Sequence, residues 1–358
     1  MDTILDKTSK PDSSAKCPGK TKNLNTRLNQ TKKEKCNVLR IGCVQKHIRL
    51  LSEQKRLFYA CKISNNEKGF EKLKVWLDGH GCDETLHCCC EATGNYYEAA
   101  AEYLAAHYKM SVENPRKIKA YAVSELKRSK NDKQDAKTIA EFCEEKSRKL
   151  KTWKPKNQTE KELQSITRYI ARLKQQKASE TVKRQTASDN IKDLIDETID
   201  YLGSKIKEAE GRLKTYINQN PELKQKAANL TTIPGIGIRT AATIMAALSG
   251  NNDFKTAKQF TAYLDPAEYK SGTSVKGKDR ISKVGDCITR AALYSPALIA
   301  YRIGTFPRLV ANMKQNGKHI MQILTAIMRK LAVVAYTLHK TNTFFEKQRY
   351  TRIQQKAV

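Results

Sequence analysis

The sequence predicts an α/β domain followed by an all-α region. Between residues 37 and 142, short apolar runs with strand character are interleaved with helical patterns. From about Thr159 onward, nearly every pattern has helical spacing. The chain has 358 residues, of which 39% are hydrophobic and 29% charged, so two or three domains can each bury a core of their own.

Residues 1–36 precede the first strand pattern and contain almost no apolar residues. They carry nine Lys and Arg against four Asp and Glu. Such a composition cannot bury enough apolar surface to fold. We expect a disordered basic arm here, serving either as a nucleic-acid contact or as a solvated leader.

The first domain, residues 37–142, is expected to form a mixed sheet with helices. The expected strands cover residues 38–43, 47–51, 56–60, 86–90 and 110–112. The expected helices cover residues 69–77, 96–108 and 120–142. Strands followed by alternating helix and strand are typical of an α/β domain.

A helical spacer, residues 143–227, follows. Its apolar residues recur every three or four positions, as in a heptad pattern: Leu163, Ile166, Ile170, Leu173, and then Ile191, Ile195, Ile199, Leu202, Ile206, Ala209 and Leu213. Asn220-Pro221 ends the second run. Two long antiparallel helices within the chain and a dimerising coiled coil fit this pattern equally well.

The third part, residues 228–345, is again helical and is followed by a short tail, residues 346–358. It opens on a glycine-rich turn and closes on an amphipathic helix through Ile320, Ile323, Ile327, Leu331, Val334 and Leu338.

The charge balance indicates the partner. A total of 67 Lys and Arg against 37 Asp and Glu leaves a net charge of +30, which favours a polyanion such as DNA or RNA. No run approaches the 18 to 20 apolar residues of a membrane span, and the N-terminus lacks the apolar core of a signal peptide. We expect an intracellular protein, no membrane partner and reduced cysteines.

The turn Pro234-Gly235-Ile236-Gly237, followed by Arg239, has the form of a helix-hairpin-helix. Glycines let a backbone approach a phosphate, and the N–H groups of the next helix bind its oxygens. A plain connector between two helices is the alternative, because similar turns occur without any ligand.

Three carboxylates are candidates for metal binding. Glu91 ends an apolar strand, and Asp132 and Asp135 share one helix face at i, i+3 spacing. Carboxylates that converge in this way can hold two Mg²⁺ ions for phosphodiester chemistry. The alternative for the two aspartates is an ordinary solvated face, since Lys130, Lys133 and Lys137 surround them.

Two other groups of residues are candidates for a nucleophile and for a metal site. Ser271 lies among cations, where a serine can attack a phosphate while the cations offset the developing charge, or where the segment is simply a flexible basic loop. His80, Cys82, His87 and Cys88 to Cys90 lack the spacing of a zinc finger. Since adjacent strand residues alternate faces, we expect buried thiols at Cys88 to Cys90.

Several segments together resemble a known family, the bacterial insertion-sequence transposases of the one-hundred-and-ten type, which include the pilin-gene invertases. The resemblance runs from about Asn37 to Phe345. It is carried by the segments Glu91-Ala92-Thr93-Gly94, Asn114-Pro115-Arg116-Lys117-Ile118-Lys119-Ala120, Asn131-Asp132-Lys133-Gln134-Asp135, Ile233-Pro234-Gly235-Ile236-Gly237, Tyr269-Lys270-Ser271-Gly272 and Ile281-Ser282-Lys283-Val284-Gly285.

The resemblance implies a RuvC-like first domain with an RNase H-like fold and a four-carboxylate Mg²⁺ site. It also implies a coiled-coil spacer and a C-terminal domain that supplies a serine nucleophile. By position, Glu91, Asp132 and Asp135 match the second, third and fourth carboxylates, and Ser271 matches the nucleophile. The implied partners are double-stranded DNA of the element ends and target, a structured guide RNA, and further copies of the chain as a dimer or tetramer.

The first carboxylate of the family's metal site has no counterpart in this sequence. The family's first strand ends in a Gly-Ile-Asp-Val-Ser-Lys pattern, whereas Gly42-Cys43-Val44-Gln45-Lys46 offers either Cys43 in place of the acid or a deletion of it. A thiol is a soft ligand poorly suited to Mg²⁺, so a site of three carboxylates should be weakened or empty. The segment before Ser271 is about two residues short, and Val284 and Asp286 stand where Arg and Asn are expected.

Two functions of different classes follow from these observations. The first is a DNA transposase or recombinase of the bacterial cytoplasm and nucleoid, with Ser271 as nucleophile. The second is a repurposed family member that binds nucleic acid and no longer transfers strands, which the missing acid at Cys43 favours. A third and less favoured hypothesis is a purely structural coiled-coil protein. The expected DNA contacts are Pro234, Gly235, Gly237, Arg239, Lys276, Lys278, Arg280, Lys283 and Arg290.

Overall fold

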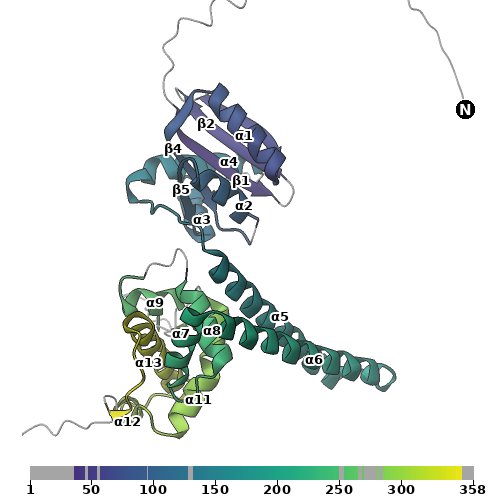
Figure 1. Ribbon diagram of the computed structural model, residues 1–358, viewed down its shortest axis with the longest axis vertical. Helices are drawn as coiled ribbons and strands as arrows, with labels where there is room; N and C mark the ends of the chain where they lie inside the picture. The colour runs from purple at the N-terminus through teal and green to yellow at the C-terminus, as the bar shows by residue number, and fades with distance from the viewer. Residues whose placement is uncertain are drawn as a thin grey trace, which may run out of the picture. The chain divides into compact units, whose positions relative to one another are not determined.

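The computed structural model describes residues 36–44, 47–54, 57–94, 96–127, 132–249, 254–264, 268–269, 280–281 and 285–348. The chain divides into two compact units, Met1–Thr152 and Trp153–Val358, drawn in Figure 1. The predicted basic arm lies outside the described residues, apart from Cys36, which begins the first strand.

A five-stranded mixed sheet forms the centre of the first unit. Its strands are β1 (Cys36–Val44), β2 (His47–Gln54), β3 (Leu57–Ser64), β4 (Cys82–Glu91) and β5 (Lys109–Glu113). The strand order is β3-β2-β1-β4-β5. The first three strands pair antiparallel, whereas β1, β4 and β5 run parallel. The mixed sheet expected from the sequence is therefore present.

Four α-helices accompany this sheet: α1 (Glu67–Gly79), α2 (Glu98–Ala105), α3 (Pro115–Ser124) and α4 (Asp132–Lys146). Asn66 begins α1 by accepting a hydrogen bond from the Gly69 N–H at 2.9 Å, the expected role of an Asn cap. Helix α1 packs against β3 and β4, and α4 packs against β1, β2 and β4. Helix α4 thus covers the strands whose ends carry the candidate chemistry.

The single helix predicted over residues 120–142 is wrong, because the chain forms α3 and α4 there instead. Leu126 adopts a left-handed conformation with φ of 51°. The N–H of Lys127 then bonds the carbonyl of Ala122 at 3.1 Å, which closes the C-terminus of α3 as in a Schellman turn. Periodicity alone does not reveal this stop, since Leu126 is not a residue that usually adopts φ above zero.

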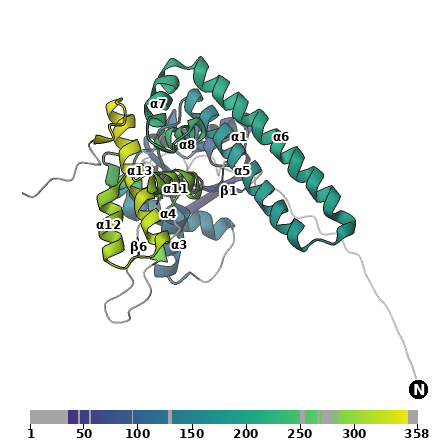
Figure 2. The same ribbon diagram turned by 90° about the horizontal axis from the view of Figure 1, so that it is seen from below.

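Two long helices open the second unit as an antiparallel hairpin (Figure 1 and Figure 2). Helix α5 spans Gln158–Thr186 and α6 spans Asp189–Gln219. The two helices pack against each other, and the core of this unit buries apolar side chains at the heptad positions Leu163, Ile170, Leu173, Leu202, Ile206, Ala209 and Leu213. Of the two arrangements that the heptads allowed, the chain contains the intramolecular pair.

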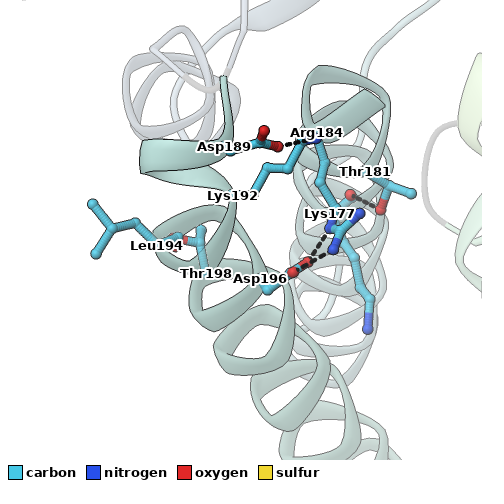
Figure 3. A network of polar contacts seen from close by, with 8 residues as sticks. All are labelled: Lys177, Thr181, Arg184, Asp189, Lys192, Leu194, Asp196 and Thr198. Carbon is cyan, nitrogen blue, oxygen red and sulfur yellow. Dashed lines mark hydrogen bonds and ion pairs between the residues drawn. The ribbon is translucent and has the colours of Figure 1, made fainter. Parts of the chain in front are cut away.

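Near the turn that joins α5 to α6, charged groups hold the two helices together. In Figure 3 the Arg184 guanidinium of α5 reaches the Asp196 carboxylate of α6, while Leu194 points away from α5. Leu194 is 58% exposed. The apolar interface therefore belongs to the half of the hairpin nearer the remaining helices.

The rest of the second unit is a helical bundle around its last helix. The elements are α7 (Pro221–Thr231), α8 (Ile238–Leu248), α9 (Ala257–Leu264), β6 (Glu268–Tyr269), β7 (Arg280–Ile281), α10 (Cys287–Ala292), α11 (Tyr294–Arg302), α12 (Pro307–Gln315) and α13 (Ile320–Thr341). Helix α13 packs against α7, α8, α9, α11 and α12. Its length and apolar composition would suffice to cross a membrane, but Ile327, Leu331 and Ala335 are fully buried in the core.

Candidate active site

The carboxyl ends of three parallel strands meet at one edge of the sheet. Glu91, the last residue of β4, is the direct partner of Glu113, the last residue of β5. On the other side, Ile41 of β1 pairs with Cys90, so Cys43 also lies at this edge, two residues beyond Ile41. Ligands of open α/β sheets bind outside the carboxyl ends of the strands. We therefore expect the catalytic groups of the first unit at this edge.

Helix α4 covers the face of the sheet to which Glu91 belongs. Cys89 forms a buried cluster with Ile139, Phe142 and Cys143 of α4. Side chains two residues apart on a strand share a face, so Glu91 lies on the same side as Cys89. The predicted strand and helix carboxylates consequently belong to one side of the sheet.

The chain after α4 returns to the sheet. The Ser111 hydroxyl donates to the backbone oxygen of Lys151 at 2.8 Å, which places the chain just after α4 beside the middle of β5. Asp135 lies one turn before Ile139, which packs against the sheet, and is partly buried.

The donors of this region fit a hard divalent cation in kind, because carboxylate oxygens are the ligands that Mg²⁺ prefers. Within the part of the chain whose side chains are described, no three His, Cys, Asp or Glu groups come together closely enough to hold a metal ion. The side chains of Asp132 and Cys43 are outside that part. Glu91 and Asp135 are thus the described members of the expected set.

Glu113 is a carboxylate that the sequence reasoning missed. It is 7% exposed, and its Oε2 accepts a hydrogen bond from the Lys117 ammonium at 2.7 Å. The signal was available, because Glu113 ends an apolar strand directly before a helix, as Glu91 ends β4 before its turn. Only the parallel pairing of the two strands makes these acids neighbours.

The three adjacent cysteines are buried thiols, as expected. Cys88, Cys89 and Cys90 are each no more than 1% exposed. A hydrogen bond with Cys143, burial and the charges of Cys143, Cys90 and Glu113 together raise the pKa of the Cys89 thiol. The Cys89 thiol is therefore protonated at neutral pH, and all three cysteines are buried packing groups.

His87 is the buried polar residue of the same strand. Its Nε2 lies 2.8 Å from the Ser111 hydroxyl oxygen, and since that hydroxyl already donates to the Lys151 carbonyl, the imidazole is the donor. Burial, with the charge of Lys109, lowers the pKa of His87 to about 4. The imidazole is neutral at pH 7 and links β4 to β5.

The two glycines of the turn between α7 and α8 have different surroundings. Gly235 has φ of +85°, and a Cβ there would lie 3.0 Å from Pro296 Cα and 3.1 Å from Ile299 Cβ of α11. A Cβ at Gly237 would meet nothing within 4 Å, and no side chain caps α8 after it. Gly235 therefore packs inside the bundle, and Gly237 with the first turn of α8 is the open part of the turn.

The two expected DNA-contacting arginines that are described both have protein partners. Arg239 Nη1 donates to Glu210 Oε1 of α6 at 3.0 Å, and Lys174 of α5 shares that oxygen at 2.9 Å. Arg290 Nη1 donates to the backbone oxygen of Leu264 at 2.8 Å. Each arginine thus joins segments of the bundle.

Asp286, one of the departures from the family pattern, is a helix cap. Its carboxylate accepts from the Ile288 N–H at 3.0 Å and from the Thr289 hydroxyl at 2.6 Å. Asn and Asp serve about equally well at this position. The added charge at Asp286 is therefore compatible with the local fold.

The predicted nucleophile lies in a segment outside the described residues. Ser271, Lys276, Lys278 and Lys283 belong to it, and of Arg280 the backbone alone is described. The described strands on either side, β6 and β7, pair antiparallel, with Tyr269 opposite Arg280. Asp286 N–H also bonds the Tyr263 carbonyl at 3.0 Å, so the chain before and after Ser271 is held together.

Comparison with known families matches both units. A family model described as transposase, of the DEDD type in the IS110 group, matches residues 42–188. A second, described as transposase of the IS116/IS110/IS902 family, matches residues 227–311. Glu91, Asp132 and Asp135 lie within the first match and Ser271 within the second.

Individual relatives align over much of the chain. The pilin gene-inverting proteins of Moraxella bovis and Moraxella lacunata are each 34% identical over 294 residues, which is 80% of this chain and 91% of theirs. The transposase for insertion sequence element IS1328 of Yersinia enterocolitica is 30% identical over 156 residues, 41% of this chain and 44% of its own.

Proposed function

The chain belongs to the IS110 family of transposases, and from this premise we propose that it recombines DNA by serine attack on a phosphodiester, assisted by Mg²⁺ and guided by RNA. The observation that carries the proposal is the 34% identity to pilin gene-inverting proteins over most of both chains. The net charge of +30 supports polyanionic partners, namely DNA ends, target DNA and guide RNA.

The carboxyl edge of the first unit is proposed to hold the metal. Glu91, Asp132 and Asp135 would be the ligands, since their oxygens suit Mg²⁺. When bound, Mg²⁺ would neutralise charge on the attacking and leaving oxygens of the phosphodiester. The role of the chain is to hold these carboxylates on a rigid strand end and on the first turns of a helix.

Ser271 is proposed to supply the nucleophile. Its hydroxyl would lose a proton and its oxygen would bond to phosphorus, while the bond from phosphorus to a deoxyribose oxygen breaks and that oxygen takes up a proton. The product is a covalent protein–DNA link. Lys276, Lys278, Arg280 and Lys283 would offset the charge of the transition state and hold the backbone. Gly237 and the first turn of α8 would contact a further phosphate, with Pro234, Gly235, Arg239 and Arg290 shaping that surface.

We further propose the following division of labour. Residues 37–142 form the RuvC-like metal domain, residues 143–227 a coiled-coil spacer and residues 228–345 the serine domain. The chain would act in the bacterial cytoplasm, at the nucleoid, as a dimer or tetramer.

A second function is favoured by one observation, the missing acid at Cys43. If the remaining carboxylates bind Mg²⁺ too weakly, the protein would hold DNA and RNA without transferring strands. Replacing Cys43 by Asp separates the two functions. Recombination that appears in Cys43→Asp and is absent from the unaltered chain would establish the binding function.

Covalent capture tests the main proposal. Purified protein, Mg²⁺, the RNA transcribed from the element flank and labelled element-end DNA are incubated and then separated under denaturing conditions. We expect a protein–DNA adduct that Ser271→Ala lacks and that Ser274→Ala, a serine of the same segment, retains. Tight DNA and RNA binding without any adduct would instead support the binding function.

A further inference from the structure

We propose that Glu113 supplies the carboxylate missing from the end of β1, and so completes the metal site at the carboxyl edge together with Glu91 and the α4 aspartates. This inference rests on the metal-assisted function proposed above. It assigns a ligand role to a residue outside the set that the resemblance implies.

The position of Glu113 comes from the strand ladder. Glu113 and Glu91 are direct partners at the ends of adjacent parallel strands, which lie about 4.8 Å apart. Partnered residues of neighbouring strands project to the same side of a sheet. Glu91 shares a face with Cys89, two residues before it, and Cys89 packs against α4. Glu113 therefore lies on the α4 side, as Glu91 does.

Glu113 is a buried carboxylate whose charged partner is an exposed lysine. A buried carboxylate is costly unless a positive charge neutralises it. Among the described residues, the Lys117 ammonium contacts one oxygen of Glu113, Oε2, at 2.7 Å, and the Lys117 side chain is 63% exposed while that of Glu113 is 9% exposed. A long, solvated lysine can move away at little cost. A divalent cation could then take its place.

The backbone under Glu113 is fixed relative to Glu91. The Ala92 N–H donates to the Glu113 carbonyl at 2.9 Å, directly after the last ladder pair. Asn114 then caps α3 by accepting from the Arg116 N–H at 2.9 Å. Both carboxylates thus project from anchored strand ends, which is the preorganisation that a metal site requires.

The contact between Glu113 and Lys117 also has a purely structural interpretation. In that interpretation the two residues form only an i, i+4 ion pair at the start of α3.

Manganese binding separates these interpretations without requiring activity. Mn²⁺ is titrated into the full-length protein, and free Mn²⁺ is followed by electron paramagnetic resonance. We expect Glu113→Gln and Glu91→Gln each to weaken Mn²⁺ binding at least tenfold. Glu84→Gln is the matched control, because Glu84 is an exposed acid on the same strand far from the carboxyl edge, and it should change binding less than twofold.

Lys117→Met is a second variant, for which the two interpretations predict different Mn²⁺ affinities. If Glu113 binds the metal, removing the competing ammonium raises Mn²⁺ affinity. If the pair is only structural, Glu113→Gln and Lys117→Met lower the melting temperature alike and leave Mn²⁺ affinity unchanged, which overturns the inference. Loss of binding in Glu91→Gln but not in Glu113→Gln also overturns it and keeps the proposed metal function. An unaltered chain that binds no Mn²⁺ contradicts both.

Discussion

Gly235 and Gly237 stand two positions apart in one turn but play different physical roles. Gly235→Ala introduces a Cβ at a positive φ and within 3.1 Å of Pro296 and Ile299. We expect it to lower the free energy of unfolding by about 2–4 kcal/mol. Gly237→Ala meets open space and should cost less than about 1 kcal/mol.

Urea unfolding and DNA binding measured on both variants check this prediction. Gly237→Ala should weaken DNA binding while stability is nearly retained, because the added methyl group stands at the proposed phosphate contact. Equal stability losses at the two positions would show that the turn is simply a connector.

His87 makes the first unit sensitive to acid. Its pKa is about 4 in the folded protein, against 6.5 in the unfolded chain, so between these values the unfolded state binds more protons. The stabilisation is complete above pH 6.5 and is lost as the pH falls toward 4. We expect a loss of about 3 kcal/mol over this window.

The test uses His87→Gln, which keeps an N–H donor for Ser111 but does not titrate. Unfolding is followed by Trp76 fluorescence in a Trp153→Phe background, so that His339, whose pKa burial also lowers to about 4 in the second unit, does not contribute. The unaltered chain should lose stability on acidification more steeply than His87→Gln. Parallel curves would disprove the assignment.

At the scale of the element, the α5–α6 hairpin shows which apolar residues of α6 contribute to stability. Leu213 is 1% exposed in the core of this unit, whereas Leu194 on the same helix is 58% exposed. Leu213→Ala should therefore cost about 3 kcal/mol of unfolding free energy, because it leaves a cavity. Leu194→Ala removes the same atoms from a solvated site and should change stability by less than about 0.5 kcal/mol.

Urea titration followed by Trp153 fluorescence in a Trp76→Phe background measures both substitutions. Similar losses at both leucines would contradict the burial described here. A Leu194 effect that grows on dilution of the protein would place this outer face in a contact between copies.

The charge of the whole molecule sets how its DNA binding depends on salt. With a net charge of +30, binding should weaken about a thousandfold or more between 50 and 200 mM salt, since each neutralised phosphate contributes roughly 0.9 to the slope of log K against log salt. Fluorescence anisotropy with labelled duplex measures this slope.

Residues 1–36 contribute nine of the cations. Deleting them should make the slope shallower, and replacing only their Lys and Arg by Gln should have the same effect at unchanged length. An unaltered slope in both variants would make this segment a solvated leader.

The sequence alone determined the local features of the molecule. Short apolar runs predicted a mixed sheet, heptads predicted two long helices, and the order of motifs identified the family. These features depend on neighbouring residues, whose propensities and spacing act over a few positions of the chain. The motifs also predicted Glu91, Asp132, Asp135 and Ser271 as site residues. Of these four, the structure describes the side chains of Glu91 and Asp135.

The tertiary structure decided what depends on residues far apart in the chain. Heptad spacing is the same whichever helix fills the groove, so only the folded chain shows that α5 pairs with α6. Glu113 becomes a neighbour of Glu91 because β4 and β5 lie side by side, and Gly235 is constrained because α11 packs against it. Such contacts arise from the spatial order of elements, which local periodicity does not encode.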